Sequence, residues 1–177
     1  MNPTPRLRCQ EHTLPIMPKS AVVVAGATRS GKSRTLHAIA DGHQLDGHVY
    51  AIKGRRAYIY FCSVQELTRE FCKYNMVIER VKRLIHECVS KRCDLLIIAF
   101  SMYVVKGKVN DACITKPLDY LRRRVKNTRL IYLRKETARE IDLFDRLMSR
   151  SKAKRVKSNE DYAGQAREIL KVVKSLP

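Results

Sequence analysis

The chain of 177 residues has no tryptophan, seven glycines and only 17 acidic residues against 36 lysines and arginines. The resulting formal charge of +19 favours a polyanionic partner such as nucleic acid or a phosphorylated small molecule, and a solvated basic surface is an equally good interpretation. No apolar run approaches the roughly 20 residues of a membrane span, and no signal-peptide core is found near the start. We therefore expect no membrane partner.

The six cysteines form no Cys-x-x-Cys pair and no zinc-site spacing with histidine. Three of them lie in or beside apolar runs, where a thiol behaves as a small hydrophobic side chain. We therefore expect reduced cysteines and a cytoplasmic location, with a Cys88–Cys93 disulfide left open as an alternative.

Proline is concentrated near the start, where four of the first eighteen residues are prolines. We interpret residues 1–19 as a flexible N-terminal arm and residues 20–177 as one domain, which is long enough to bury a core. Within this domain, short strand-like runs alternate with helical patterns. This alternation predicts an α/β fold with crossover helices.

Three apolar runs have the composition of strands that are buried on both faces, namely residues 21–25, 95–100 and 130–133. Two further runs, 48–53 and 57–62, alternate in polarity around a glycine. They predict a β-hairpin inserted into the sheet near residues 48–62.

Helices are predicted over residues 32–40, 118–126, 136–151 and 160–176. Ser63 with Glu66 three residues later forms a capping-box pattern, which predicts a further helical stretch after Ser63 with a break near Asn75. Pro117 suits the first position of the helix that follows it, so residues 106–115 are expected to form a loop.

One segment combines glycine, lysine and serine at a fixed spacing directly after the first apolar run. Residues 26–33 read GATRSGKS and match the phosphate-binding pattern GxxxxGK[ST], in which the glycines let successive N–H groups point at a phosphate. Lys32 would bridge the β- and γ-phosphates, and the hydroxyl of Ser33 would ligate Mg²⁺. The helix N-terminus after the loop attracts anions as well, so we predict a site for ATP or another nucleoside triphosphate. The residues expected to contact it are Gly26, Ala27, Thr28, Arg29, Ser30, Gly31, Lys32, Ser33 and Arg34.

The acidic residue that usually holds the water shell of the metal is missing from the end of the second apolar run. The apolar run that begins at Leu95 continues into Ala99-Phe100-Ser101, whereas phosphoryl-transfer sites of this kind usually have an aspartate at the end of such a strand. Asp94 lies at the opposite end of the strand, away from the edge where ligands bind in an open α/β sheet. Glu66 is the best candidate for a base or metal-shell carboxylate, and a purely capping role for Glu66 is at least as good an interpretation.

Three segments resemble a known family: the loop 26–33 with Arg29 inside it, the stretch TRLIYLRKETAREIDLFDRLMSR at 128–150, and DYAGQAREIL at 161–170. Together they look like the nucleoside monophosphate kinase group of P-loop kinases, and most of all like thymidylate kinases. The resemblance implies a P-loop NTPase three-layer sandwich around a mostly parallel sheet. It also implies that Arg29 neutralises the transferring phosphoryl group and that a basic lid precedes the closing helix.

Two motifs of thymidylate kinases are missing. Thr28 stands where that family carries an acidic residue, and Ala99-Phe100-Ser101 stands where it carries an Asp-Arg-Tyr type motif. Thymidylate is therefore not the expected acceptor.

The predicted helix 136–151 has a basic face, because Arg139, Arg146 and Arg150 fall within roughly 40° of one another at 100° per residue. The opposite side carries Ile141, Phe144, Leu147 and Met148. Arg146 and Arg150 are candidate catalytic residues that close over the phosphates, and a solvated basic face is the equal alternative.

Basic residues are concentrated in residues 116–157, which hold 15 lysines and arginines and 5 acidic residues. This segment would either bind a nucleic-acid backbone through counterion release or form a mobile lid over a nucleotide. Aromatic residues that would stack on a single strand are not interleaved with its basic runs.

The leading hypothesis is a phosphotransferase that uses Mg²⁺ with ATP, or another nucleoside triphosphate, and moves the γ-phosphoryl to a nucleoside, nucleotide or other small acceptor. In this hypothesis Lys32 and Arg29 balance charge, and Ser33 holds the metal. Two alternatives stay open: a nucleic-acid-associated NTPase or polynucleotide kinase, and a non-catalytic nucleotide-binding regulatory module.

Overall fold

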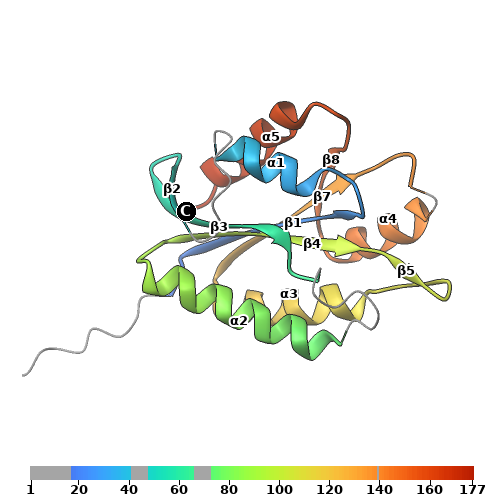
Figure 1. Cartoon of the computed structure of the whole chain (residues 1–177), viewed down its shortest axis with the longest axis horizontal. Helices are drawn as coiled ribbons and strands as arrows, with labels where there is room; N and C mark the ends of the chain where they lie inside the picture. The colour runs from blue at the N-terminus through green and yellow to red at the C-terminus, as the bar shows by residue number, and fades with distance from the viewer. Residues whose placement is uncertain (1–16, 41–47, 66–72, 139) are drawn as a thin grey trace, which may run out of the picture.

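The computed structural model of the chain describes residues 17–40, 48–65, 73–138 and 140–177 (Figure 1). Its centre is a six-stranded sheet of order β2-β3-β4-β1-β7-β8. The strands are β1 (Ser20–Ala27), β2 (Val49–Ile52), β3 (Arg55–Ser63), β4 (Leu95–Met102), β7 (Asn127–Arg134) and β8 (Lys154–Lys157). Neighbouring strands are parallel except for the antiparallel pair β2–β3, which confirms the predicted α/β class with a mostly parallel sheet.

Helices cover both faces of this sheet (Figure 1). The first face carries α1 (Lys32–Ile39) and α5 (Tyr162–Lys174), which share one hydrophobic cluster with the sheet. On the second face, α2 (Tyr74–Ser90), α3 (Ala112–Arg124) and α4 (Ile141–Arg150) contribute to another cluster. None of the described helices is long and apolar enough to cross a membrane.

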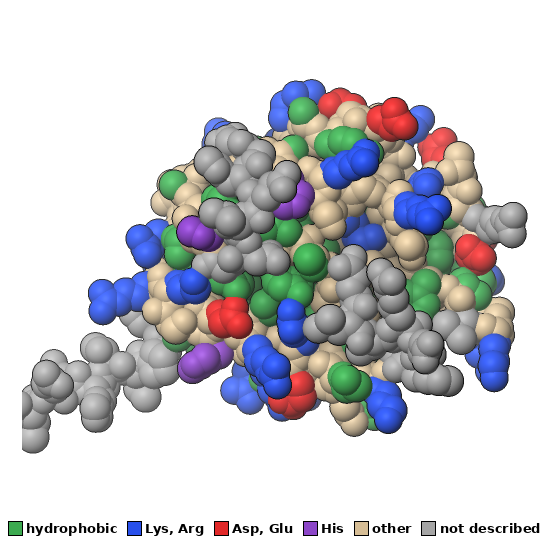
Figure 2. Space-filling view, viewed as in Figure 1, with side chains coloured by type: hydrophobic (Ala, Val, Ile, Leu, Met, Phe, Trp, Pro, Cys, Tyr) green, Lys and Arg blue, Asp and Glu red, His purple; other side chains and the backbone are tan. Residues whose placement is uncertain are grey.

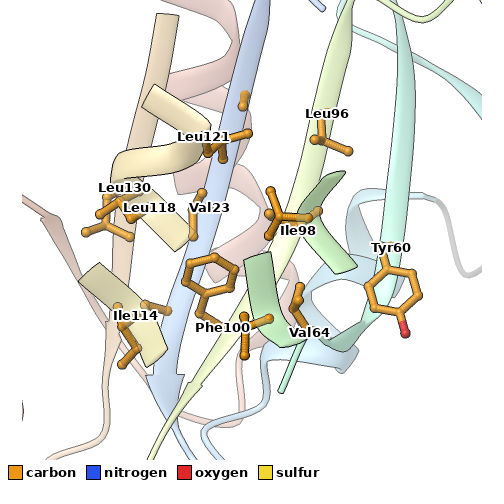
Figure 3. Packing of buried hydrophobic residues seen from close by; sticks show 14 of the residues in the cluster. Val23, Tyr60, Val64, Leu96, Ile98, Phe100, Ile114, Leu118, Leu121 and Leu130 are labelled. Atoms are coloured by element: carbon orange, nitrogen blue, oxygen red, sulfur yellow. The ribbon is translucent and has the colours of Figure 1, made fainter. Parts of the chain in front are cut away.

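The central strands are buried on both faces because their side chains alternate between the two clusters. Val23, Ile98 and Phe100 point toward the layer of α2 and α3 (Figure 3), whereas Val22 and Ile97 belong to the cluster of α1 and α5. All five side chains are fully buried. Burial on two sides accounts for the uninterrupted apolar runs in the sequence.

The predicted hairpin is confirmed, with a tighter turn than expected. Val49 pairs with Tyr58 and Ile52 with Arg55, so that Lys53 and Gly54 form the turn. Their φ angles of 49° and 77° are both left-handed, which a two-residue hairpin turn requires for the twist of its strands.

The prediction of a loop over residues 106–115 is wrong for most of these residues. A small hairpin of β5 (Val104–Val105) and β6 (Lys108–Val109) occupies its first part, and α3 begins at Ala112. Pro117 therefore lies inside a helix instead of at its first position. Because Pro117 has no N–H, the carbonyl of Cys113 four residues earlier cannot receive its helical bond. That carbonyl accepts a hydrogen bond from Nε2 of Gln65 instead, at 3.1 Å.

The predicted N-cap at Ser63 is also wrong. Ser63 is the last residue of β3, and its hydroxyl donates to Oε1 of Gln65 instead of capping a helix. The helix α2 begins at Tyr74, after the extended residue Lys73, which agrees with the expected break near Asn75, and it ends at Ser90. Glu66 lies outside the described residues.

Two C-terminal predictions need correction. The segment expected to form a basic lid contains β8, an edge strand in which Tyr132 and Leu133 pair with Arg155 and Val156. Its single buried residue, Val156, is too weak a signal for a strand in the sequence. The preceding helix α4 begins at Ile141, five residues later than predicted, and Arg139 lies outside the described residues.

The cysteines differ from the expectation in one respect. Cys88 and Cys93 are free thiols, and Sγ of Cys88 donates to the carbonyls of Cys93 and Leu95 at 3.7 Å, so the alternative Cys88–Cys93 disulfide is wrong. Cys113 is disulfide-bonded, so the expectation that the cysteines are reduced is wrong for this residue. Residues 1–16 of the predicted N-terminal arm lie outside the described residues.

Candidate functional site

The loop 26–33 lies where the central strand ends. The β1 residues Gly26 and Ala27 pair with Ser101 and Met102 of β4, and Gly26 also pairs with Leu133 of β7. The helix α1 then begins at Lys32, with Gly31 as its N-cap. The loop is therefore at the carboxyl edge of the parallel sheet, which is where ligands bind in open α/β folds.

The loop backbone is bent by two left-handed residues, Arg29 with φ 59° and Gly31 with φ 81°. The N–H of Ser30 donates to the carbonyl of Ala27 at 3.1 Å, and the first helical bond runs from Thr35 to the carbonyl of Gly31 at 2.9 Å. Amides that precede the first helical bond are available to an anion at the positive end of the helix.

Lys32 directs its ammonium group back into this loop. The side chain is buried, and Nζ donates to the carbonyls of Gly26 at 3.0 Å and Ala27 at 2.8 Å, with Oγ of Ser30 at 3.4 Å. A buried ammonium must exchange its hydration for such partners. A phosphate that enters the loop would meet a charge already positioned there.

The start of α5 packs over the loop, which sequence reasoning did not predict. A Cβ added at Gly31 would lie 2.5 Å from Cε1 of Tyr162, so only glycine fits beneath this ring. Arg34 donates from Nη1 to the hydroxyl of Tyr162 at 3.2 Å and places its guanidinium over the ring. Arg34 is thus engaged with Tyr162 and not with the loop itself.

A hydrogen-bonded path fixes the segment before α5 against α1. Gln165 is buried, accepts from Oγ1 of Thr35 at 2.7 Å and donates to the carbonyl of Asn159 at 2.6 Å. The hydroxyl of Ser158 donates to the carbonyl of Ser30 at 2.7 Å. The single signal for this arrangement in the sequence is the polar run that precedes the closing helix.

A cavity of about 390 Å³ opens beside the loop between these segments. Arg29, Lys135 and Lys157 bring positive charge to it, and Nζ of Lys135 donates to the carbonyl of Arg29 at 3.4 Å. The remaining lining residues are Ser30, Glu136, Thr137, Ser158, Asn159, Glu160 and Tyr162. The cavity therefore combines three cations, two carboxylates, hydroxyl groups and one aromatic ring directly next to the loop.

The neighbouring strands β3 and β4 contain no acidic residue in their described ranges, in agreement with the sequence. The polar group at their carboxyl ends is Gln65, which is buried and accepts from the N–H of Ser101 at 2.9 Å. The carbonyl of Asp94 accepts from the N–H of Ser20, at the other end of the sheet. Within the described ranges, histidine, cysteine and acidic side chains form no cluster that could hold a metal ion. Ser33, the predicted Mg²⁺ ligand, lies half-buried at the start of α1.

Arg146 and Arg150 do not line the cavity beside the loop. Both are exposed on α4 and line a separate cavity of about 810 Å³ between α4 and the β5–β6 hairpin. The predicted amphipathic pattern of this helix is confirmed, since Phe144, Leu147 and Met148 are buried.

Ion pairs connect the two cavities. Nε of Arg134 lies 3.0 Å from Oδ2 of Asp145 in the larger cavity, and Nη1 of Arg134 lies 3.5 Å from Oε1 of Glu136 in the smaller one. Oε1 of Glu136 also lies 3.8 Å from Nζ of Lys157, so that this lysine is the last member of the row of ion pairs. The hydrogen bond to Asp145 raises the pKa of Arg134, and burial raises the pKa of the neighbouring Tyr132. Both side chains keep their protons at neutral pH.

Comparison with known proteins adds no family assignment. No family model matches the chain, and neither a curated protein nor a solved structure gives a match.

Proposed function

We propose that the protein binds a nucleoside triphosphate at the loop 26–33 and transfers its γ-phosphoryl group to a small acceptor. The observation that carries this proposal is the buried ammonium of Lys32, held within 3.0 Å of the carbonyls of Gly26 and Ala27 at the N-terminus of α1. A phosphate placed there would give this ammonium a partner of opposite charge in place of two neutral carbonyls, and charge-assisted hydrogen bonds to phosphate are among the strong ones in proteins.

Charge for the remaining phosphates would come from the adjoining cavity. Arg29, Lys135 and Lys157 line it, and these residues take the clamping role that the sequence suggested for Arg146 and Arg150. The hydroxyl of Ser33 would supply one ligand to Mg²⁺, and the phosphates and water would supply the others, as is common for this ion. When bound, Mg²⁺ would neutralise charge that develops on the transferring group.

The volume and lining of the cavity suit part of a nucleotide. About 390 Å³ lies near the lower end of the range for small-molecule pockets. The ring of Tyr162 offers a surface for a base or sugar, while Ser158 and Asn159 offer hydroxyl and amide groups. These residues would orient the nucleoside with its phosphates directed toward Lys32.

Nucleotide binding without transfer is the second candidate. Gln65 stands at the ends of β3 and β4 with its carbonyl oxygen bonded to Ser101 and Ser63 and its amide bonded to Cys113. An amide in this place cannot act as a base, and a protein with this set of groups could hold a nucleotide as a regulatory ligand.

Phosphoryl transfer from ATP with Mg²⁺, measured against a panel of nucleosides, nucleotides and sugars, distinguishes the two candidates. We expect at least one acceptor to be phosphorylated by the wild type and the rate to fall at least tenfold in Arg29→Gly. Because Arg29 has a left-handed φ of 59°, glycine is compatible with the backbone there while it removes the guanidinium, so we expect the variant to fold and to report on the lost charge.

Arg92→Gly is the matched control, since Arg92 is an exposed arginine with a left-handed φ of 54° outside the loop, and its rate should equal the wild-type rate. ATP binding with no turnover on any acceptor would favour the regulatory role. A wild type that binds neither ATP nor another nucleoside triphosphate would overturn both candidates.

A further inference from the structure

Three cavities adjoin one another along α4. The first, of about 810 Å³, lies between α4 and the β5–β6 hairpin, and the second, of about 350 Å³, lies between α3 and α4. The third, of about 620 Å³, extends from the end of α4 along β7 and β8. Arg150 lines all three, and Arg122 lines the second and third. We call these three cavities, which share Arg150, the basic groove.

Positive charge dominates the basic groove. Eight cationic and three acidic side chains line it. The cations come from five elements and the turn after α4: Lys108, Arg122, Arg129, Arg146, Arg150, Lys152, Lys154 and Arg155. The sequence segment 116–157 contains seven of them, and folding adds Lys108 from the hairpin.

Most of these cations are not neutralised. Among the described residues, Lys154 is the one groove cation with a carboxylate partner, Glu168 at 3.4 Å. Arg122 and Arg155 donate to the carbonyl of Ser151 and the hydroxyl of Ser149, which leaves their charges uncompensated. Of the three acids, Asp145 already pairs with Arg134. The groove therefore carries a positive field that an anionic partner would compensate.

The form of the groove distinguishes between kinds of polyanion. Lysines and arginines are spread over the whole face of the molecule in Figure 2, so net charge alone marks no partner site. A row of cations along three joined cavities fits an extended chain of phosphates better than one isolated phosphate. An anionic membrane would also need apolar side chains to insert, and the large exposed hydrophobic residues described, Met17, Val49, Tyr74 and Met76, lie outside the groove.

The lining also bears on the state of the nucleic acid. Aromatic side chains, on which unstacked bases rest in single-strand sites, do not line any of the three cavities. A double helix keeps its own bases stacked and presents two phosphate backbones to cations.

We propose that the basic groove binds the phosphate backbone of double-helical nucleic acid without reading its sequence. The proposal does not depend on nucleotide binding at the loop, because the groove and the loop cavity have no lining residue in common.

The test is fluorescence anisotropy of a labelled duplex of about 20 base pairs over a series of salt concentrations. We expect Arg129→Gln/Arg150→Gln to bind at least tenfold more weakly at about 0.1 M salt, with the slope of log K against log salt reduced by about 1.8. Lys73→Gln/Arg83→Gln removes the same charge from exposed positions outside the groove and should bind as the wild type does. Lys108→Gln/Arg146→Gln, at the other end of the groove, provides a second pair if the first is unstable.

Single strands of the same sequence and vesicles rich in anionic lipid complete the test. Tighter binding of the duplex, lost in the groove variants and kept in the control, supports the proposal. Equal weakening by the control pair, a preference for single strands or vesicles, or no binding of the duplex at about 0.1 M salt would overturn it.

Discussion

The bonds of Gln65 allow a quantitative test of how the sheet edge is held together. Its side chain is 2 % exposed, and its oxygen accepts from the N–H of Ser101 and the hydroxyl of Ser63, both at 2.9 Å. Its amide donates to the carbonyl of Cys113 at 3.1 Å. Methionine has a similar length and can make none of these bonds. Gln65→Met therefore leaves buried polar groups without a partner.

The expected cost follows from two backbone groups, the N–H of Ser101 and the carbonyl of Cys113. A buried donor or acceptor left unsatisfied costs about 1–3 kcal/mol, so Gln65→Met should lower the free energy of unfolding by about 3 kcal/mol. For a chain of this size, such a loss corresponds to a fall in Tm of about 6–12 °C. Urea unfolding followed by circular dichroism measures the change.

The variant Pro117→Ala tests whether the cost of Gln65→Met comes from the carbonyl of Cys113. In Pro117→Ala the new N–H can donate to the carbonyl of Cys113, so this carbonyl no longer needs Gln65. We expect Gln65→Met to cost about 1 kcal/mol less in the Pro117→Ala background than in the wild type. An equal cost in both backgrounds, or a cost below about 0.5 kcal/mol in the wild type, would refute this account of the sheet edge.

Two further predictions concern the loop and the core. Gly31→Ala should lower the free energy of unfolding by about 2 kcal/mol in urea melts, because the φ of Gly31 is 81° and a Cβ would meet Tyr162. This cost should be smaller when Tyr162→Ala is added. A cost that Tyr162→Ala does not change would contradict the packing of Tyr162 on Gly31. Burial raises the pKa of the Cys88 thiol, so the reactive thiolate is suppressed at pH values below the raised pKa. Iodoacetamide at mildly alkaline pH should therefore leave Cys88 unmodified in the folded protein and modify it in urea. Peptide mass spectrometry measures the modification. Equal modification of Cys88 in both states would contradict its burial.

The sequence was a sufficient guide to the centre of the fold because its signals are local there. Uninterrupted apolar runs predicted the buried strands β1, β4 and β7, and a glycine between alternating runs predicted the hairpin of β2 and β3. The loop 26–33 was found by the spacing of its glycines and lysine, which reflects backbone geometry over a few residues.

Elements that depend on distant partners could not be predicted in the same way. The strand β8 has one buried side chain and exists because β7 offers it an edge, so its lysines suggested a lid. The helix α3 contains Pro117, and the compensating bond comes from Gln65, about fifty positions earlier in the chain. The cover of Tyr162 over Gly31 and the separation of Arg146 from the loop likewise arise from tertiary packing.

The central claim is that the loop 26–33 binds the phosphates of a nucleotide through Lys32. Titration calorimetry with ATP, ADP, AMP and adenosine tests it most directly, in the wild type and in Lys32→Ala. We expect affinity to rise with the number of phosphates in the wild type, and Lys32→Ala to weaken ATP binding by about 10–100-fold while adenosine is unaffected, since a hydrogen bond to a charged group contributes about 1.5–3 kcal/mol. Adenosine bound as tightly as ATP, or ATP bound equally well by Lys32→Ala, would contradict the claim.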